Sequence, residues 1–348
     1  MAAYTTVNDP TIYMNPVPYT GTEVTLSITG VGFQPDLVWL KKRGNTSDHF
    51  WTDAVRGVTE TIYSNANTAE TTESAGLTAF GADGFTLGDD YDINQEDQTQ
   101  MSWNWKANGA GSSNGDGAET TTVSVDTTAG FSIVKYDGTG TNTNFGHGLG
   151  VAPNVILVKS TTGSHDWVLN GDFLGSTTWQ HKLILNSNAA KATADNFDDT
   201  KPTASVFYLN GGHSTVNGSG ETYIAYCFAE KTGYSKFGSF TGNGNDNGPF
   251  VYTGFRPAWT MIKCTSATDY WVVDDNKRST FNVMQNTLNP DRTAAEYTGS
   301  AYGIDFLSNG FKIRNDDGQY NLSGGTFVYM AFAEAPFVNS EGVPCNAR

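Results

Sequence analysis

Short hydrophobic runs recur along the chain, and glycine- and asparagine-rich turns separate them. The most apolar runs, at 37–40, 155–158 and 259–262, are four residues long, which is typical of strands buried on both faces. The segments 101–105 and 224–228 combine large aromatic residues with small ones, which suits the face of a sheet in a sandwich. Almost no stretch places apolar residues at the helical spacing of 3.6. The pattern therefore predicts an all-β fold with little helix.

The same landmarks return three times in the same order, which indicates an internal repeat. An aromatic-x-Gly motif is followed after 16, 17 and 17 residues by Pro35, Pro153 and Pro257. Each proline begins an apolar strand, since proline cannot donate to a ladder. A tryptophan follows the prolines by 16, 14 and 14 positions, and an aromatic closing strand ends 70, 75 and 75 positions after them. These spacings predict three tandem β-sandwich repeats of the jelly-roll type. The tryptophans in question are Trp51, Trp167 and Trp271.

Two junctions divide the repeats. The first is rich in Gly, Ser and Asn and is expected to be a flexible linker. The second, at 229–234, is short, so repeats two and three are expected to pack closely. The predicted organisation is a first repeat over 1–108, the linker over 109–121, a second repeat over 122–233, a third repeat over 234–338 and an irregular tail over 339–348.

Charge narrows the classes of partner. The 348 residues carry a net charge of −16, and such a surface opposes binding to the phosphates of nucleic acids or to anionic membranes. No apolar run approaches the roughly 20 residues that span a bilayer, and the first residues lack the pattern of a secretory signal. Cys227, Cys264 and Cys345 have no C-x-x-C spacing, so neither a zinc site nor a dense disulfide framework is predicted.

Candidate catalytic and metal-binding groups are few. The acidic loop Asp89–Asp97 could offer oxygen ligands to Ca²⁺ from Asp90 and Asp92, although a solvated acidic loop explains it more simply. His49 and His165 each have a neighbouring aspartate, yet no serine or cysteine lies in a nucleophile-elbow motif. The Gly-rich segment 140–150 lacks the Lys-Ser/Thr of a phosphate loop. We therefore predict no catalytic residue, no metal and no cofactor, and whether the acidic loop binds Ca²⁺ stays open.

Aromatic residues are the remaining candidates for binding. Trp51, Trp167 and Trp271 occur in every repeat, and a landmark of the fold more simply marks packing than a sugar platform. Trp179 has no counterpart in the other repeats and stands beside Gln180 and His181. Trp179 and His181 are accordingly the weak candidates for glycan contact.

Several segments resemble a family of structural proteins of tailed, mostly marine, bacteriophages. They are the opening segment 1–10, the block 32–41, the segment 226–231 and the ending 336–348. The resemblance covers essentially the whole chain, and each repeat also resembles a small concanavalin-like jelly roll. It implies a virion structural role and brings no catalytic residues to carry over.

The sequence and the resemblance together predict a non-enzymatic component on the virion surface, either a tail-associated appendage or a head decoration, which could contribute to host adhesion. It would be made in the host cytoplasm and carried on the particle. The expected partners are other virion proteins, further copies of the chain within the particle, and a host surface glycan. The alternative is a lectin-like receptor-binding protein or a polysaccharide-active enzyme. Position on the particle, oligomeric state and receptor are left open.

Overall fold

The structure is a computed structural model that describes residues 5–336. Antiparallel strands dominate this part of the chain, and α-helix is confined there to three elements of four residues each. The prediction of an all-β fold with little helix is confirmed. The helical elements are α1 (Tyr91–Asn94), α2 (Ser214–Asn217) and α3 (Gly318–Asn321), with 3₁₀ turns at Pro10–Ile12 and Asp172–Leu174.

The first pair of sheets is built from the first third of the chain. Its large sheet has the order β1-β9-β3-β4-β5-β6, and its small sheet has the order β2-β8-β7. The strands are β1 (Met14–Thr20), β2 (Leu26–Thr29), β3 (Leu37–Lys42), β4 (Phe50–Asp53), β5 (Glu60–Tyr63), β6 (Thr71–Thr72), β7 (Leu77–Gly81), β8 (Gly84–Leu87) and β9 (Thr99–Trp105).

The second pair has the largest sheet, with the order β10-β11-β12-β19-β14-β15-β16-β17, and a small sheet of β13 and β18. The strands are β10 (Ser112–Asn114), β11 (Thr121–Asp126), β12 (Phe131–Asp137), β13 (Thr143–Gly146), β14 (Val155–Ser160), β15 (Val168–Gly171), β16 (His181–Ile184), β17 (Ala192–Thr193), β18 (Val206–Leu209) and β19 (Thr222–Phe228). Because β10 pairs with β11, the flexible linker predicted over 109–121 is wrong in that respect: part of the segment is an edge strand.

The third pair has a large sheet of order β20-β28-β22-β23 and a small sheet of order β21-β27-β26, with a two-stranded ribbon of β24 and β25 beside them. The strands are β20 (Ser235–Thr241), β21 (Phe250–Tyr252), β22 (Phe255–Cys264), β23 (Val272–Asp275), β24 (Asn286–Thr287), β25 (Tyr297–Thr298), β26 (Ile304–Leu307), β27 (Gly310–Ile313) and β28 (Thr326–Pro336).

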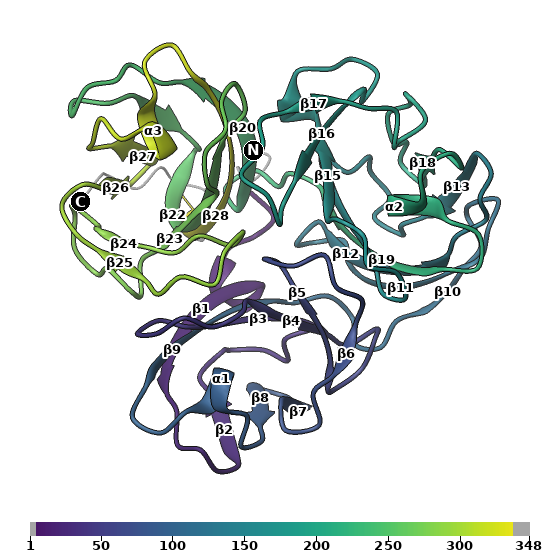
Figure 1. The fold of residues 1–348 in the computed structure, drawn as a ribbon, viewed down its shortest axis with the longest axis horizontal. Helices are drawn as coiled ribbons and strands as arrows, with labels where there is room; N and C mark the ends of the chain where they lie inside the picture. Colours follow the sequence, from purple (N-terminus) through teal and green to yellow (C-terminus); the bar gives the residue numbers. More distant parts are fainter. Residues whose placement is uncertain (1–4, 337–348) are drawn as a thin grey trace.

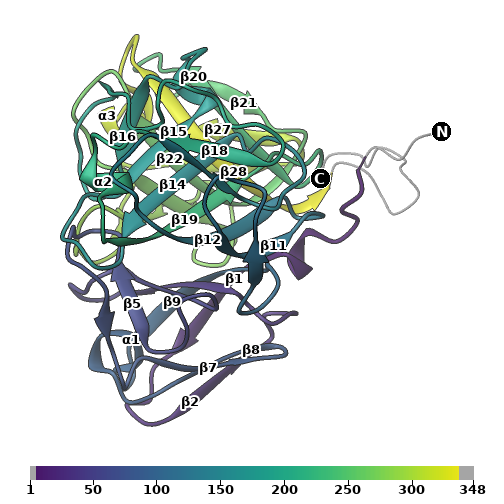
Figure 2. The ribbon, with the colours of Figure 1, turned by 90° about the vertical axis from the view of Figure 1, so that its right-hand side faces the viewer.

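One strand order recurs in all three large sheets: β1-β9-β3-β4, β12-β19-β14-β15 and β20-β28-β22-β23. The pairing register recurs as well. Leu37 faces Trp105, Val155 faces Phe228 and Trp259 faces Phe332, each two residues after its proline. The three pairs surround a common centre, with the first pair below the second and third in Figures 1 and 2.

The aromatic-x-Gly motif closes each first strand against the short helix. A Cβ on Gly21, Gly138 or Gly242 would lie 2.2–2.3 Å from a backbone oxygen just after α1, α2 or α3, so the chains can approach only at glycine. A buried asparagine ends each helix and accepts a hydrogen bond from the backbone amide that follows the glycine. These asparagines are Asn94, Asn217 and Asn321.

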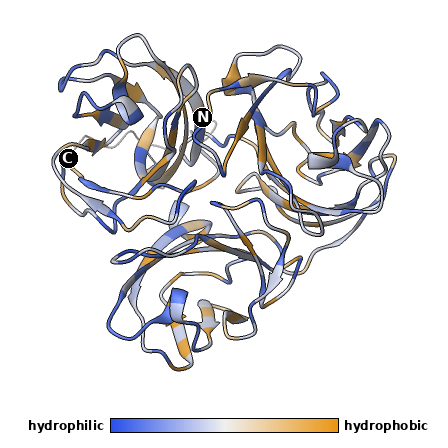
Figure 3. Ribbon diagram, in the orientation of Figure 1, coloured by the Kyte–Doolittle hydropathy of each residue, from blue (hydrophilic) through white to orange (hydrophobic). Residues whose placement is uncertain are grey.

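Each central strand contributes to two cores, which explains its uninterrupted apolar run. In β3, Val38 and Leu40 point into the first sheet pair, whereas Leu37 and Trp39 point toward the common centre. The same alternation holds in β14 and β22. Hydrophobic residues accordingly lie mainly on the strands, and the peripheral loops are largely hydrophilic (Figure 3). The central core thus joins the three pairs into one unit.

Candidate functional site

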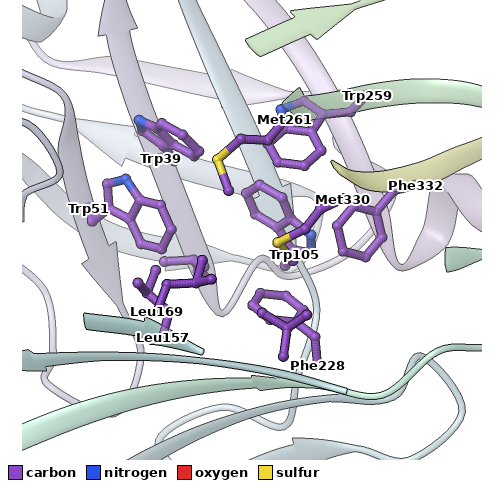
Figure 4. Close-up of a pocket in the computed structure, with 12 residues that line it drawn as sticks. Trp39, Trp51, Trp105, Leu157, Leu169, Phe228, Trp259, Met261, Met330 and Phe332 are labelled. Atoms are coloured by element: carbon purple, nitrogen blue, oxygen red, sulfur yellow. The ribbon is translucent and has the colours of Figure 1, made fainter. Parts of the chain in front are cut away.

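The centre of the molecule is a dry aromatic core. Trp39, Trp51, Trp105 and Trp259 come from the first and third large sheets, and Leu157, Leu169 and Phe228 line the second sheet's side (Figure 4). The Trp39 ring lies 4.7 Å from Trp51 and 6.3 Å from Trp259, measured between centroids. The cavity enclosed here is about 20 Å³, near the minimum for one water, and its lining offers no polar surface. This core therefore supplies cohesion and is no ligand pocket.

The repeat tryptophans are core residues, as predicted. Trp51, Trp167 and Trp271 are at most 4% exposed. They are not all equivalent, however. Trp51 faces Trp39 in the hairpin register, and the residue at that position in the second hairpin is Leu169. Trp167 and Trp271 instead match His49, two residues earlier, because all three hairpins have the same length.

The three pairs meet in a head-to-tail ring, and one backbone hydrogen bond marks each contact region, here called a seam. The first seam lies between the first and second pairs, the second seam between the second and third, and the third seam between the third and first. The bonds run from Glu70 N to Thr161 O, from Lys191 N to Thr265 O, and from Glu296 N to Arg43 O. The acceptors occupy the same place after β3, β14 and β22, so the ring has threefold pseudosymmetry.

A second contact also follows the ring. Trp167 Nε1 donates to Tyr63 O across the first seam, and Trp271 Nε1 donates to Ile184 O across the second. At the third seam the matching residue is His49. Its Nδ1 accepts from Trp39 Nε1, its Nε2 makes no hydrogen bond of standard geometry, and burial lowers the pKa of the imidazole. His49 is thus a neutral packing residue.

Buried ion pairs connect two of the seams. At the first, Arg56 Nε donates to Asp53 Oδ2 at 2.6 Å, Tyr226 of the second pair donates to the same oxygen, and Arg56 also reaches Glu70. Asp53 and the Arg56 side chain are at most 1% exposed. Burial alone would lower the pKa of Arg56, but the adjacent Asp53 raises it above its ordinary value, so the guanidinium stays charged.

The third seam repeats this arrangement with different partners. Arg278 pairs with Asp275 and Glu296, and the side chains of Arg278 and Asp275 are fully buried. Trp103 of the first pair donates Nε1 to Asp275 Oδ2 at 3.0 Å, in the place that Tyr226 takes at the first seam. The Arg278 guanidinium also lies 5.5 Å from the centre of the Trp103 ring, which adds a cation–π contact.

The second seam is apolar. The matching positions hold Gly171 for the aspartate, Leu174 for the arginine and Met330 for the tyrosine or tryptophan. Lys191, in the position of Glu70 and Glu296, donates Nζ to the carbonyl of Leu174 at 3.0 Å. The ring therefore contains two seams with a buried ion pair and one seam that is held together by apolar packing.

Three matched lysines lie at one end of the inner strands. Lys41, Lys159 and Lys263 are completely buried. Burial lowers the pKa of Lys41 and of Lys159 to about 8, and it also lowers that of Lys263. Each ammonium donates to backbone carbonyls, and Lys41 Nζ reaches Thr293 O of the third pair at 3.2 Å. These cations are structural donors without access to a substrate.

Trp179 does not form the exposed surface that we predicted for glycan contact. Its side chain is 0% exposed and lies in the core of the second pair, with its ring centroid 5.5 Å from that of Phe197. Trp179 Nε1 donates to Asp172 Oδ1 at 3.1 Å. A buried ring cannot stack on a sugar, so this assignment is corrected. His181 is partly exposed on β16, and burial together with Lys191 lowers its pKa. Because Trp179 is buried, the two residues do not form the glycan contact that we predicted.

The acidic loop 89–97 holds α1. Asp90 Oδ1 accepts from the amides of Asp92 and Ile93 and so caps the helix. Asp92 lies 3.4 Å from Lys42 Nζ. In residues 5–336 no group of three or more His, Cys, Asp or Glu side chains is arranged to hold a metal ion.

His165 and Ser160 do not form a nucleophile–base pair. His165 Nε2 lies 3.0 Å from Glu221 Oε1, and Ser160 Oγ donates to the other oxygen of the same carboxylate. Serine and histidine therefore contact the carboxylate rather than one another, unlike an activated nucleophile. Cys227 and Cys264 are buried thiols, and Cys345 lies outside the described residues.

The seam residues were missed at the level of sequence, although a signal exists. Asp53-x-x-Arg56 and Asp275-x-x-Arg278 both begin 18 residues after the repeat proline. The second repeat has Gly171 and Leu174 at the same spacing, so a search for landmarks common to all three copies overlooks the motif.

The fold and its seams define a class: a single-chain ring of β-sandwich units around a shared aromatic core. The chain belongs to the family described as Domain of unknown function (DUF7483), whose model matches residues 9–336. No curated protein and no solved structure matches the chain. No helix among the described residues is long and apolar enough to cross a membrane.

Proposed function

We propose that this protein is a non-enzymatic structural component on the surface of a tailed bacteriophage particle, as a tail-associated appendage or a head decoration. The buried charges of the protein stabilise its architecture, and this observation is the main support for the proposal. Asp53, Arg56, Asp275 and Arg278 all serve to hold the sheet pairs together. Such an arrangement favours a rigid building unit over an enzyme, whose charged groups would converge on an open cleft.

Two sequence features support the same proposal. The segments at 1–10 and 336–348 resemble those of structural proteins of tailed phages, and the net charge of −16 suits a protein displayed at high local concentration. The partners would be other virion proteins and further copies of the chain.

Purified particles provide the test. Mass spectrometry of gradient-purified virions should detect the protein at a fixed copy number, and a cryo-EM map should contain its three-lobed density on the outer surface. Its absence from such particles would overturn the proposal. Release of reducing ends from host polysaccharide by the purified protein, abolished by Asp90→Asn or Asp92→Asn, would establish an enzyme instead.

A further inference from the structure

The outward face of the third small sheet exposes aromatic side chains. On β21, Phe250 is 46% exposed and Tyr252 is 58% exposed, on either side of Val251, which is buried in the core of the third pair. Side chains two residues apart on a strand share a face and lie about 7 Å from one another. Two aromatic rings therefore stand side by side on the surface.

The fold does not require aromatic residues there. The pairings Ile28–Phe85, Phe145–Phe207 and Val251–Phe311 place the three small sheets in a common register. In that register the position of Phe250 holds Ser27 in the first pair and Asn144 in the second, and the position of Tyr252 holds Thr29 and Gly146. Two copies of the unit thus fold with small or polar residues at these positions, so the aromatic pair is a feature of the third copy alone.

A third exposed aromatic residue lies across the same sheet. Phe281, which is 83% exposed, precedes a segment that runs along the free edge of β26, where Met284 bridges Ile304. Asn282 fixes this segment by exchanging two side-chain hydrogen bonds with the backbone of Phe306. The segment and β21 flank β27 and β26, so three strand spacings, about 14 Å, separate the two aromatic edges.

Two charged residues, a glycine and Leu307 occupy the middle of this face, since Leu307 lies opposite Gly310 in the register. Gly310 lies opposite Tyr252, and a Cβ there would lie 2.0 Å from Val251 O and 3.2 Å from the Phe250 ring, so the ring lies close to the glycine. Lys312 lies between Phe250 and Asp305 in the register, and its Nζ donates to Gly248 O. Asp305 is paired with Arg314 at 3.4 Å. The polar groups are thus held in place between the aromatic edges.

We propose that this aromatic face, comprising Phe250, Tyr252, Phe281, Gly310, Lys312 and Asp305, binds a neutral glycan. A pyranose ring presents an apolar C–H face, which stacks on an aromatic ring, and a rim of hydroxyls, which bonds to fixed charged groups. The core of a protein–protein interface is apolar with a polar rim. Here Lys312 and Asp305 lie beside Leu307 within the face, between aromatic residues at both edges, so the charged groups are not confined to a rim. The net charge of −16 disfavours polyanionic glycans.

The proposal goes beyond the structural role, and it holds whether or not the protein is found on a particle. The double variant Phe250→Ser/Tyr252→Thr copies the first sheet pair and should fold normally. Its matched control is Ser27→Ala/Thr29→Ala on the first pair. The probes are maltohexaose, cellohexaose and laminarihexaose, titrated by calorimetry into the full chain.

The parent is expected to bind at least one of these neutral hexaoses. The double variant should lose at least tenfold in affinity with an unchanged melting temperature, Phe281→Ser should weaken binding in the same direction, and the control should bind like the parent. No binding of any hexaose by the parent, or equal binding by the double variant, would overturn the proposal. Loss of a virion-protein contact instead of glycan binding in the double variant would make the face a protein-docking surface and would equally overturn it.

Discussion

The buried ion pair of the first seam yields a quantitative prediction. Arg56→Leu would leave Asp53 fully buried without its cation, and it would also remove the donors to the carbonyl oxygens of Trp51 and Glu60. Removing one partner of a buried pair typically costs about 3–5 kcal/mol, because the remaining charge stays desolvated. We expect Arg56→Leu to lower the free energy of unfolding by that amount.

The second seam shows how the loss can be repaired. It has Gly171 and Leu174 in the positions of Asp53 and Arg56 and remains closely packed. In the double variant Asp53→Asn/Arg56→Leu, the amide oxygen can still accept from the two backbone amides that Asp53 Oδ1 now caps. The amide nitrogen then takes the place of Oδ2 and can donate to the Tyr226 hydroxyl. We expect this variant to recover most of the loss, with a coupling energy of about 2 kcal/mol or more.

Urea unfolding followed by tryptophan fluorescence measures both variants, since the seams lie beside the central tryptophans. Leu174→Arg at the apolar seam is the matched control: it buries a cation without a carboxylate and should be destabilising to a similar extent. If Arg56→Leu and the double variant were equally unstable, the unpaired charge would not be the cause. The pair would then act through packing alone, and the reasoning would be refuted.

Three further predictions concern single residues. Trp179→Ala should cost about 3–5 kcal/mol of stability, as for a large core residue, and should leave glycan affinity of the folded protein unchanged; calorimetric melting and titration separate the two effects. Asn217→Ala should lower the free energy of unfolding by about 2 kcal/mol or more, because the Thr139 amide and the Thr141 carbonyl both lose their hydrogen-bond partner. A loss below about 0.5 kcal/mol in urea unfolding would contradict a structural role of these two bonds. Burial raises the pKa of Asp291 to about 7, so its contribution favours the folded state below about pH 4 and is lost as the pH rises through about 7. Asparagine is the residue type of the matching positions, since Asn65 and Asn186 accept from the amides of His49 and Trp167 as Asp291 accepts from that of Trp271. Asp291→Asn should therefore stabilise the protein at pH 8 and reduce the loss of stability with rising pH, measured by urea unfolding at several pH values. Burial also raises the pKa of Asp274 to about 6, so part of the pH dependence of stability should remain in this variant. A pH dependence equal to that of the parent would contradict the role assigned to Asp291.

Sequence patterns were sufficient for the features that each unit needs by itself. The apolar runs after Pro35, Pro153 and Pro257 predicted strands buried on both faces, and the structure confirms this because each strand serves two cores. The aromatic-x-Gly landmark likewise has a local cause, the close approach of Gly21 to the turn after α1. Such features are visible because a short segment and its nearest strands determine them.

The exposure of single aromatic residues and the contacts between units were not predictable. Exposure of a single tryptophan cannot be read from its neighbours: Trp179 stands among polar residues, yet its ring lies inside the second pair. The rings of Phe250 and Tyr252, by contrast, are exposed to solvent. Side chains alternate between the two faces of β21, so Val251 points into the core and its two neighbours point outward. The role of the Asp-x-x-Arg motifs between units could not be predicted, because their partners, such as Tyr226 and Trp103, lie more than 170 residues away along the chain.

The unlike seams also explain how three similar units can close in one order. Three sheet pairs of the same strand order could in principle meet in a wrong arrangement, since their inner faces are all apolar. In the reverse order, Asp53 and Arg56 would face Met330 of the third pair instead of Tyr226 of the second, and the ion pair would be buried without the hydroxyl that donates to Asp53. A ring of three units has only two cyclic orders, so this one mismatch is enough to favour the observed order. The seams fix the orientation of every outward face, so a binding surface present on only the third pair occupies one defined side of the molecule.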